Sequence, residues 1–279
     1  MPIVLGLLAA AFYGTGDFLA GLSGKRVPPA LVAGIVQAIG LLGAAIAVLI
    51  FPGVGPREGA LLWGAAAGVG SAGGTLALYH GLATGRMSVV ATISGLLTAV
   101  IPVLVGLALA EGLSLLSAVG IVIALPAIAL VSSAPGPPGE DAGSGAIWGF
   151  LAGVGFGLLF VALDRAGTRS GAWPLVAGQG VALALIAPLA LVAVRGADLA
   201  APAPAQMLAA GVFSSLANLA FLAATHEGAL AVVAVLTALY PGVTVILSRA
   251  VLGEHRTRLQ DVGLVAAFVA AVLVSAGSS

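Results

Sequence analysis

The sequence contains no cysteine and little charge, with ten basic and ten acidic side chains in 279 residues. The lack of cysteine excludes disulfides, thiolate metal sites and cysteine nucleophiles. The sparse and balanced charge argues against a nucleic-acid partner, because no basic stripe is present to neutralise phosphates. No G-x-x-x-x-G-K-[ST] loop is present either, which argues against coupling to ATP hydrolysis. We therefore expect no cofactor and no metal ion.

Apolar residues dominate the chain instead, at 61% of the composition. A soluble chain of this size could not bury so much apolar surface, whereas a bilayer accepts it. Apolar runs of about 20 residues, the length that spans a bilayer, fall at 3–21, 30–50, 60–82, 88–110, 114–132, 145–165, 172–194, 204–226, 229–252 and 258–276. The sequence thus predicts an all-α polytopic membrane protein with ten transmembrane helices.

The chain also repeats itself at a constant offset of 143 residues, without a gap. Gly6 aligns with Gly149, and the triplet VVA at 89–91 aligns with the same triplet at 232–234. One offset across a whole half is a strong signal of internal duplication. The Pro- and Gly-rich stretch SSAPGPPGEDAG between the copies is typical of a solvated linker. The predicted organisation is a five-helix repeat at 1–132, a linker at 133–143 and a second five-helix repeat at 144–279.

Five helices in each copy is an odd number, so two copies with one pattern enter the membrane from opposite sides. This predicts inverted repeats about a pseudo-two-fold axis in the membrane plane, an arrangement known from secondary transporters. The loops on one side carry seven Lys and Arg residues against three on the other, which by the positive-inside rule places both termini outside. Four prolines are predicted to kink their helices, namely Pro102, Pro126, Pro188 and Pro241.

Asp17 is the most informative polar residue within a predicted span. An intramembrane carboxylate is costly and normally faces the bundle interior. Gln37 and His80 are predicted at a similar depth on the same side, and all three depart from the repeat pattern. We expect these three residues to couple or gate a transport step, because an Asp–His pair can change charge near neutral pH. The alternative is that they only hydrogen-bond to one another between helices.

Hydroxyl and amide side chains predict a binding site at mid-depth. Ser71 and Thr75 align with Ser214 and Asn218, which suits a site at the interface of two repeats. Each side chain could instead bond to a carbonyl of its own helix. With aromatic walls added, the candidate substrate-binding residues are Tyr13, Ser71, Thr75, Tyr79, His80, Thr92, Phe156, Ser214, Asn218 and Tyr240. Glu111 and Glu254 are expected at the membrane edge, where they cap or orient the next helix.

Three stretches resemble the EamA-type branch of the drug/metabolite transporter superfamily: YPGVTVILSRAVLGEHRTRLQDVGLVAA at 240–267, its weaker copy LTAVIPVLVGLALAEGLSLLSAVGIVIA at 97–124, and YGTGDFLAGLSGKR at 13–26. The resemblance implies a ten-helix carrier whose central cavity is lined by the first, third, fourth, sixth, eighth and ninth helices. It also implies alternating access, and outward movement of small metabolites, often amino acids, across a bacterial inner membrane. Cytoplasmic termini are implied as well, against the charge count, so orientation stays open.

The sequence therefore predicts a secondary transporter or facilitator, monomeric or homodimeric in the lipid bilayer, for a small polar metabolite. Amino acids come first, because a zwitterion or neutral solute suits a nearly uncharged cavity better than a polyanion does. The rival is a multidrug exporter of lipophilic cations, which would favour an acid deep in the cavity. An enzyme is not expected. The remote alternative is an intramembrane serine protease that uses Ser23, in the GxSG motif at 21–24, with His80 as its base.

Overall fold

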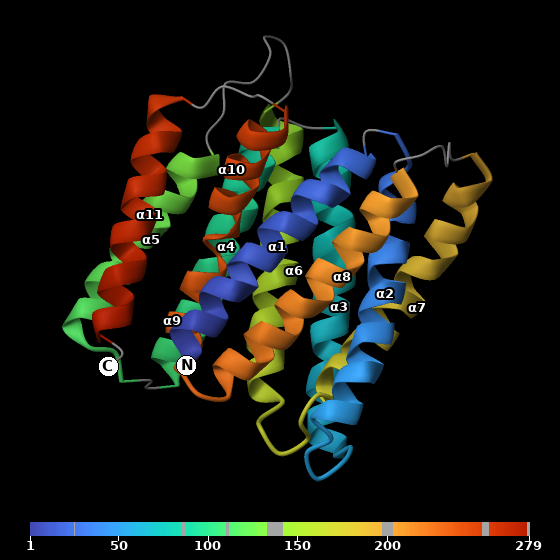
Figure 1. Ribbon diagram of the computed structural model, residues 1–279, viewed down its shortest axis with the longest axis horizontal. Coiled ribbons are helices and arrows are strands. Elements are labelled where there is room, and N and C mark those ends of the chain that lie inside the picture. Colours follow the sequence, from blue (N-terminus) through green and yellow to red (C-terminus); the bar gives the residue numbers. More distant parts are fainter. Residues whose placement is uncertain are drawn as a thin grey trace.

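The computed structural model describes residues 1–24, 26–84, 87–109, 112–132, 142–196, 203–252 and 257–277. Within these ranges the chain is helical and contains no strand, which confirms the predicted all-α class (Figure 1). The elements are α1 Pro2–Gly24, α2 Pro29–Ile50, α3 Glu58–Thr84, α4 Met87–Ala108, α5 Leu115–Ser132, α6 Ala142–Arg165, α7 Trp173–Ala193, the 3-10 turn η1 Val194–Gly196, α8 Ala203–Thr225, α9 Leu230–Thr237, α10 Tyr240–Leu252 and α11 Arg258–Gly277.

Seven helical stretches of the described chain are long and apolar enough to cross a membrane. They lie in α1, α2, α3, α6, α7 and α8 and in the stretch Leu230–Leu247, which runs through α9 into α10. Shorter apolar stretches occupy Ile93–Ala108 in α4 and Leu115–Val131 in α5. The protein is therefore a multi-pass membrane protein. A crossing by each of the ten predicted spans stays a prediction.

The ninth predicted span, 229–252, is two helices rather than one. Helix α9 ends at Thr237 and α10 begins at Tyr240, so Pro241 is the second residue of a new helix. Proline is well tolerated in a first turn, because its missing N–H would have no intrahelical partner there. The expected kink is thus a break. The other three prolines lie inside their helices, Pro102 in α4, Pro126 in α5 and Pro188 in α7.

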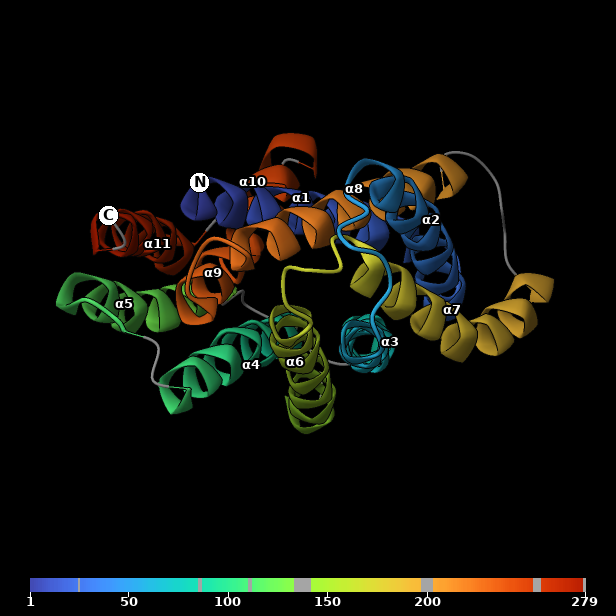
Figure 2. The same ribbon diagram turned by 90° about the horizontal axis from the view of Figure 1, so that it is seen from below.

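The helices pack in pairs that follow the repeat. Helix α1 packs along α8, and α6 along α3. At one end of the bundle α5 lies beside α11, and at the other α2 lies beside α7 (Figure 2). The 143-residue offset relates α1 to α6 and α3 to α8. The pair of α1 with α8 is therefore the repeat-related equivalent of the pair of α6 with α3. This packing is the one expected of a duplicated bundle, although opposite entry of the halves into a membrane stays a prediction.

Equivalent glycine contacts recur in the two halves. A Cβ on Gly6 would lie 3.3 Å from the Cβ of Leu236, and a Cβ on Gly149 would lie 3.1 Å from the Cβ of Ile93. The second pair is related to the first by the offset, since Gly149 is the counterpart of Gly6 and Leu236 that of Ile93. Helices α1 and α6 thus meet their partners, α9 and α4, through the same sequence positions. The duplication that the sequence shows is repeated in the packing.

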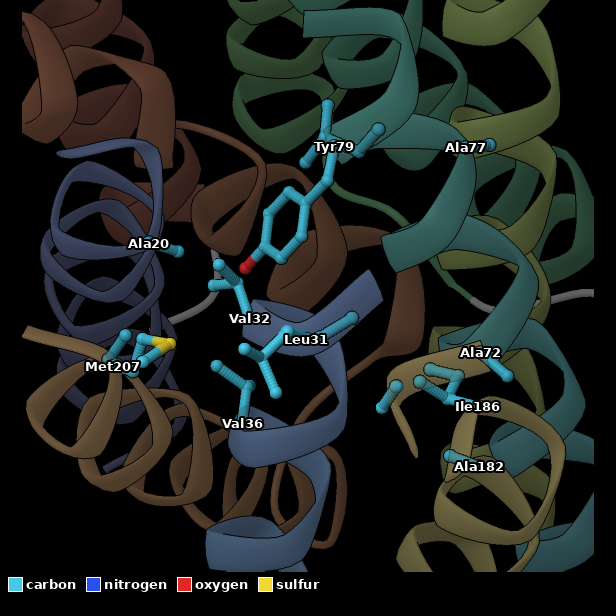
Figure 3. Packing of buried hydrophobic residues seen from close by; sticks show 14 of the residues in the cluster. Ala20, Leu31, Val32, Val36, Ala72, Ala77, Tyr79, Ala182, Ile186 and Met207 are labelled. Atoms are coloured by element: carbon cyan, nitrogen blue, oxygen red, sulfur yellow. The ribbon is translucent and has the colours of Figure 1, made fainter. Parts of the chain in front are cut away.

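Buried apolar side chains form three clusters; one joins α4, α5, α9 and α11, and the other two lie at different depths of the central helices. The Tyr79 cluster contains Ala20, Val32, Val36 and Tyr79, among others, and Figure 3 shows the Tyr79 ring reaching from α3 toward Val32 of α2. The Phe160 cluster lies toward the opposite ends of the same helices; its members include Ala9, Ala44, Ala67, Leu159, Phe160 and Leu175. The Tyr79 and Phe160 clusters leave a layer between them in which polar side chains gather.

Backbone contact between α6 and α3 gives a test of this packing. A Cβ on Gly155 would lie 2.6 Å from the backbone nitrogen of Gly74 and 2.7 Å from the carbonyl oxygen of Gly70. Gly→Ala inside a helix ordinarily stabilises by roughly 0.5–1 kcal/mol, but here the methyl group would force two backbones apart. We expect Gly155→Ala to lower the melting temperature of the detergent-purified protein.

Gly21 in α1 is the matched control, because a Cβ there would meet no atom within 4 Å. Gly21→Ala should leave the melting temperature unchanged or raise it. A rise in both variants would contradict the close packing of α6 on α3.

Candidate functional site

A cavity lies among α1, α2, α3, α4, α6, α7, α8 and α10, between the Tyr79 and Phe160 clusters. Its empty volume, including the open mouth, is about 610 Å³. It is lined by Tyr13, Asp17, Val36, Gln37, Ser71, Thr75, Tyr79, Thr98, Phe156, Leu159, Phe160, Gln179, Ser214, Asn218 and Tyr240. Val36 and Tyr79 also belong to the Tyr79 cluster, while Leu159 and Phe160 belong to the Phe160 cluster.

Ten of the twelve candidate site residues are among those that line this cavity. The sequence suggested two separate groups of candidate residues, one around Asp17 and one around Ser71. Members of both groups line the same cavity. The roles given to these residues stay predictions. Helices α2 and α7 contribute to the lining in addition to those implied by the family resemblance. The lining residues that sequence reasoning did not select are Val36, Thr98, Leu159, Phe160 and Gln179.

His80 is not among the lining residues. Its side chain is exposed, and its ring centroid lies 4.4 Å from that of Trp148 on α6. His80 directly follows Tyr79, and successive residues of a helix point about 100° apart, so Tyr79 lines the cavity while His80 lies against Trp148. Gln37 donates its Nε2 hydrogen to the Ser71 hydroxyl at 2.9 Å, which connects it to the other group of candidate residues. The expected partnership of Asp17 with His80 has no support in this arrangement.

Several sequence-based predictions fall elsewhere. The side chain of Thr92, both Glu111 and Glu254, and almost all of the linker at 133–143 lie outside the described residues. Ser23, the nucleophile of the protease alternative, is fully buried and donates its hydroxyl hydrogen to the Leu19 carbonyl at 3.0 Å. With His80 exposed on α3, this placement gives the protease alternative no support.

The cavity wall draws on repeat-related positions. Five pairs of lining residues are separated by the 143-residue offset: Tyr13 with Phe156, Asp17 with Phe160, Val36 with Gln179, Ser71 with Ser214 and Thr75 with Asn218. A cavity placed between two copies of one unit recruits the same positions from each, as in transporters built from repeats. Only the serine pair is identical. The cavity thus uses equivalent positions of both halves, while its polar groups are distributed unequally between them.

Tyr13 ties α1 to α8 at the cavity wall. Its hydroxyl donates to Oδ1 of Asn218 at 2.7 Å, and Nδ2 of Asn218 donates to the Ser214 carbonyl at 2.9 Å. The Tyr13 ring centroid lies 6.5 Å from that of Tyr240 in an edge-on arrangement. Asp17 is one helical turn beyond Tyr13 on α1, so this network fixes the part of α1 from which the carboxylate extends.

Threonine hydroxyls hold α1 against the broken helix. Thr244 of α10 donates to the Gly14 carbonyl at 3.0 Å, and Thr237 of α9 donates to the Gly6 carbonyl at 3.4 Å. A hydrogen bond between helices removes a polar group from lipid. The break between α9 and α10 lies between these two bonds, and Tyr240, the first residue after it, lines the cavity.

The described lining residues carry a single formal charge, that of Asp17. The remainder of the polar wall is made of amides and hydroxyls. Of the amides, Gln37 and Asn218 are hydrogen-bonded, whereas Oε1 of Gln179 has no partner among the described residues. Such a wall can bind a small polar molecule by hydrogen bonds and can balance one positive charge.

Comparison with known proteins identifies the second half of the chain. Residues 143–276 match the EamA-like transporter family, which is part of the drug/metabolite transporter superfamily. One solved crystal structure aligns with 99% of this chain and 96% of its own, at a TM-score of 0.76 and 18% identity, and shows a likeness of fold. No curated protein matches the sequence.

The bond between Tyr13 and Asn218 can be measured by a double-mutant cycle with Tyr13→Phe and Asn218→Leu. We expect a coupling of about 0.6 kcal/mol in the free energy of unfolding in detergent, the typical size for such bonds in membrane proteins. Thr15 is the control, since its hydroxyl donates to the Ala11 carbonyl of its own helix. Thr15→Val paired with Asn218→Leu should show no coupling; equal values for both cycles would contradict the assigned bond.

Proposed function

We propose, from the assignment of residues 143–276 to the EamA-like transporter family, that the protein is a secondary transporter or facilitator of small polar metabolites. The family match indicates a membrane transporter of the drug/metabolite type. The observation that carries the proposal is the central cavity, whose polar and aromatic wall lies between two apolar clusters of a multi-pass bundle. Substrate binds in this cavity.

The transport mechanism we propose is alternating access by two inverted five-helix halves, residues 1–132 and 144–279. Repeat-related contacts on α1 and α6, and the five repeat-related pairs of lining residues, support this organisation. The Tyr79 cluster and the Phe160 cluster lie on opposite sides of the cavity, so each can act as a gate in one of two conformations. Rocking of one half against the other opens one cluster while it closes the other.

Amino acids are the first substrate class of this proposal, exported across a bacterial inner membrane. The Asp17 carboxylate suits an ammonium group, and neighbouring hydroxyl and amide groups suit hydrogen bonds to a small solute. None of the described lining residues is Lys, Arg or His, so a polyanion such as a sugar phosphate would find no balancing charge.

A second candidate class is that of lipophilic cations. The placement of Asp17 in the cavity wall, beside the aromatic rings of Tyr13, Tyr240 and Phe160, favours it. Aromatic faces attract cations, and a carboxylate balances their charge. Amino acids and lipophilic cations share a positively charged nitrogen, which is the group that this wall is best equipped to receive.

Uptake of a radiolabelled amino-acid panel into proteoliposomes tests the proposed function. We expect saturable uptake that falls roughly ten- to a hundredfold in Asp17→Asn, the range for losing a hydrogen bond to a charged group. His80→Ala should transport as the wild type does, because His80 is exposed on α3. Acceleration by a pH gradient would indicate proton coupling, and indifference to it a facilitator. Equal loss in both variants would contradict the assigned cavity.

The gating proposal can be tested by thiol labelling, because the chain has no native cysteine. Ala20→Cys places a thiol in the Tyr79 cluster and Ala9→Cys places one in the Phe160 cluster, both at fully or almost fully buried positions. A membrane-impermeant maleimide should reach the two thiols from opposite sides. A substrate that changes the labelling rates should raise one as it lowers the other; parallel changes would rule out alternating access between these clusters.

A further inference from the structure

We propose that the cavity is built for an organic ammonium ion that bears N–H donors and no carboxylate, with the Asp17 carboxylate as its counter-charge and the Gln179 amide oxygen as a second acceptor. The inference rests on the proposed transport function and revises its first substrate class, because free amino acids carry a carboxylate and are expected to bind less tightly. It divides the nitrogen compounds that the cavity could receive by two chemical criteria. One is the presence of a carboxylate on the substrate, and the other is the presence of hydrogen on its charged nitrogen.

The first criterion follows from the charge of the wall. Asp17 is the only formally charged side chain among the described lining residues. A free amino acid would bring its own carboxylate into the same cavity, where hydroxyls and amides can donate hydrogen bonds but cannot neutralise it. Removing an unpaired carboxylate from water is costly. An amine whose carboxylate is missing or masked avoids this cost and keeps the ion pair with Asp17.

Aromatic rings around the acid strengthen the preference for a cation. Tyr13, Tyr79 and Tyr240 line the same cavity as Asp17. The Tyr13 and Phe160 ring centroids are 6.0 Å apart, so two aromatic rings are neighbours in the cavity wall. A cation close to an aromatic face gains attraction from the ring electrons, whereas a carboxylate gains none.

The second criterion follows from Gln179 on α7. Its side chain is 7% exposed, and its Oε1 has no hydrogen-bond partner among the described residues. Burying an acceptor without a donor costs free energy, so such a group in a binding cavity is suited to a donor on the ligand. A primary or secondary ammonium supplies that donor. A quaternary ammonium has the charge but no N–H group, and cannot.

Gly40 of α2 holds the Gln179 amide in place. A Cβ on Gly40 would lie 2.8 Å from Oε1 and 2.9 Å from Nε2 of Gln179, so the amide rests directly against the α2 backbone. Gln37, the other glutamine in the wall, is already engaged with Ser71. That bond uses the Nε2 donor of Gln37, whereas Gln179 is the lining amide whose buried oxygen has no hydrogen-bond partner among the described residues. Its repeat-related partner, Val36, has no polar side-chain atom, so the acceptor is present in one half only.

The experiment uses three ligand forms on each of three side chains. Alanine, leucine and phenylalanine are each tested as the free amino acid, as the C-terminal amide and as the N-trimethylated amide, by competition in proteoliposomes and by thermal stabilisation of the detergent-purified protein. At pH 6.5 the amides are mostly protonated. One of the three side chains will be preferred. For that side chain we expect the wild type to bind the amide roughly tenfold more tightly than the free amino acid or the trimethylated amide.

Three variants assign the two preferences to their residues. Gln179→Met, which removes the acceptor at similar volume, should abolish the preference for the amide over its trimethylated form and keep the preference over the free amino acid. Asp17→Asn should abolish the preference over the free amino acid. The control is Gln206→Met, since Gln206 also has an unpartnered, buried Oε1 but does not line the cavity. It should behave as the wild type does.

Distinct results would overturn the inference. Free amino acids that bind as tightly as their amides would show that Asp17 does not select against carboxylates. An unchanged ratio of amide to trimethylated amide in Gln179→Met would show that water satisfies Oε1 and that Gln179 does not select the ligand. Transport of other solutes without binding of any member of the series would refute the inference alone. The absence of any flux, with any solute, would refute the proposed function as well.

Discussion

The bundle depends on close contact between helix backbones, because lipid exerts no hydrophobic pressure between apolar helices. Glycines supply that contact on both sides of the cavity. Gly6 brings α1 against α9, and Gly149 and Gly155 bring α6 against α4 and α3. Threonine hydroxyls then bond α1 to the broken α9–α10 segment. With α1 and α6 fixed along their small faces, their larger side chains are left to border the space between the halves.

That space is where the polar groups of the described spans collect, and their state of pairing differs. Two hydrogen-bonded pairs connect one helix to another, namely Tyr13 with Asn218 and Gln37 with Ser71. Asp17 and Gln179 are not part of such a pair, and the oxygen atoms of both side chains accept hydrogen bonds. In a medium of low dielectric a satisfied pair contributes to rigidity, whereas an unsatisfied acceptor is suited to a ligand. The proposed division between structural and binding roles therefore follows from hydrogen-bond pairing rather than from residue type.

Hydropathy was sufficient to place the helices, except for the break between α9 and α10, because a membrane span must be long, apolar and internally hydrogen-bonded. The first span, expected at 3–21, is α1 at Pro2–Gly24. Depth along a helix could also be read from the sequence, but the direction of a side chain could not, which is why Tyr79 and His80 were both selected although only Tyr79 is among the lining residues. Gln179 was overlooked, although the criterion that selected Asp17, a polar residue whose repeat partner is apolar, would have found it.

The unequal repeat pairs have a further consequence for a carrier of the proposed kind. Two identical inverted halves would give inward-facing and outward-facing forms of equal energy, related by the axis. Phe160 stands in place of a second acid and Val36 in place of a second amide, so the two forms differ in energy. The empty protein then populates one of the two forms more than the other. In passive transport the Haldane relation still holds kcat/KM equal in both directions. The asymmetry then emerges as unequal half-saturation concentrations at the two faces, each balanced by a matching difference in maximal rate.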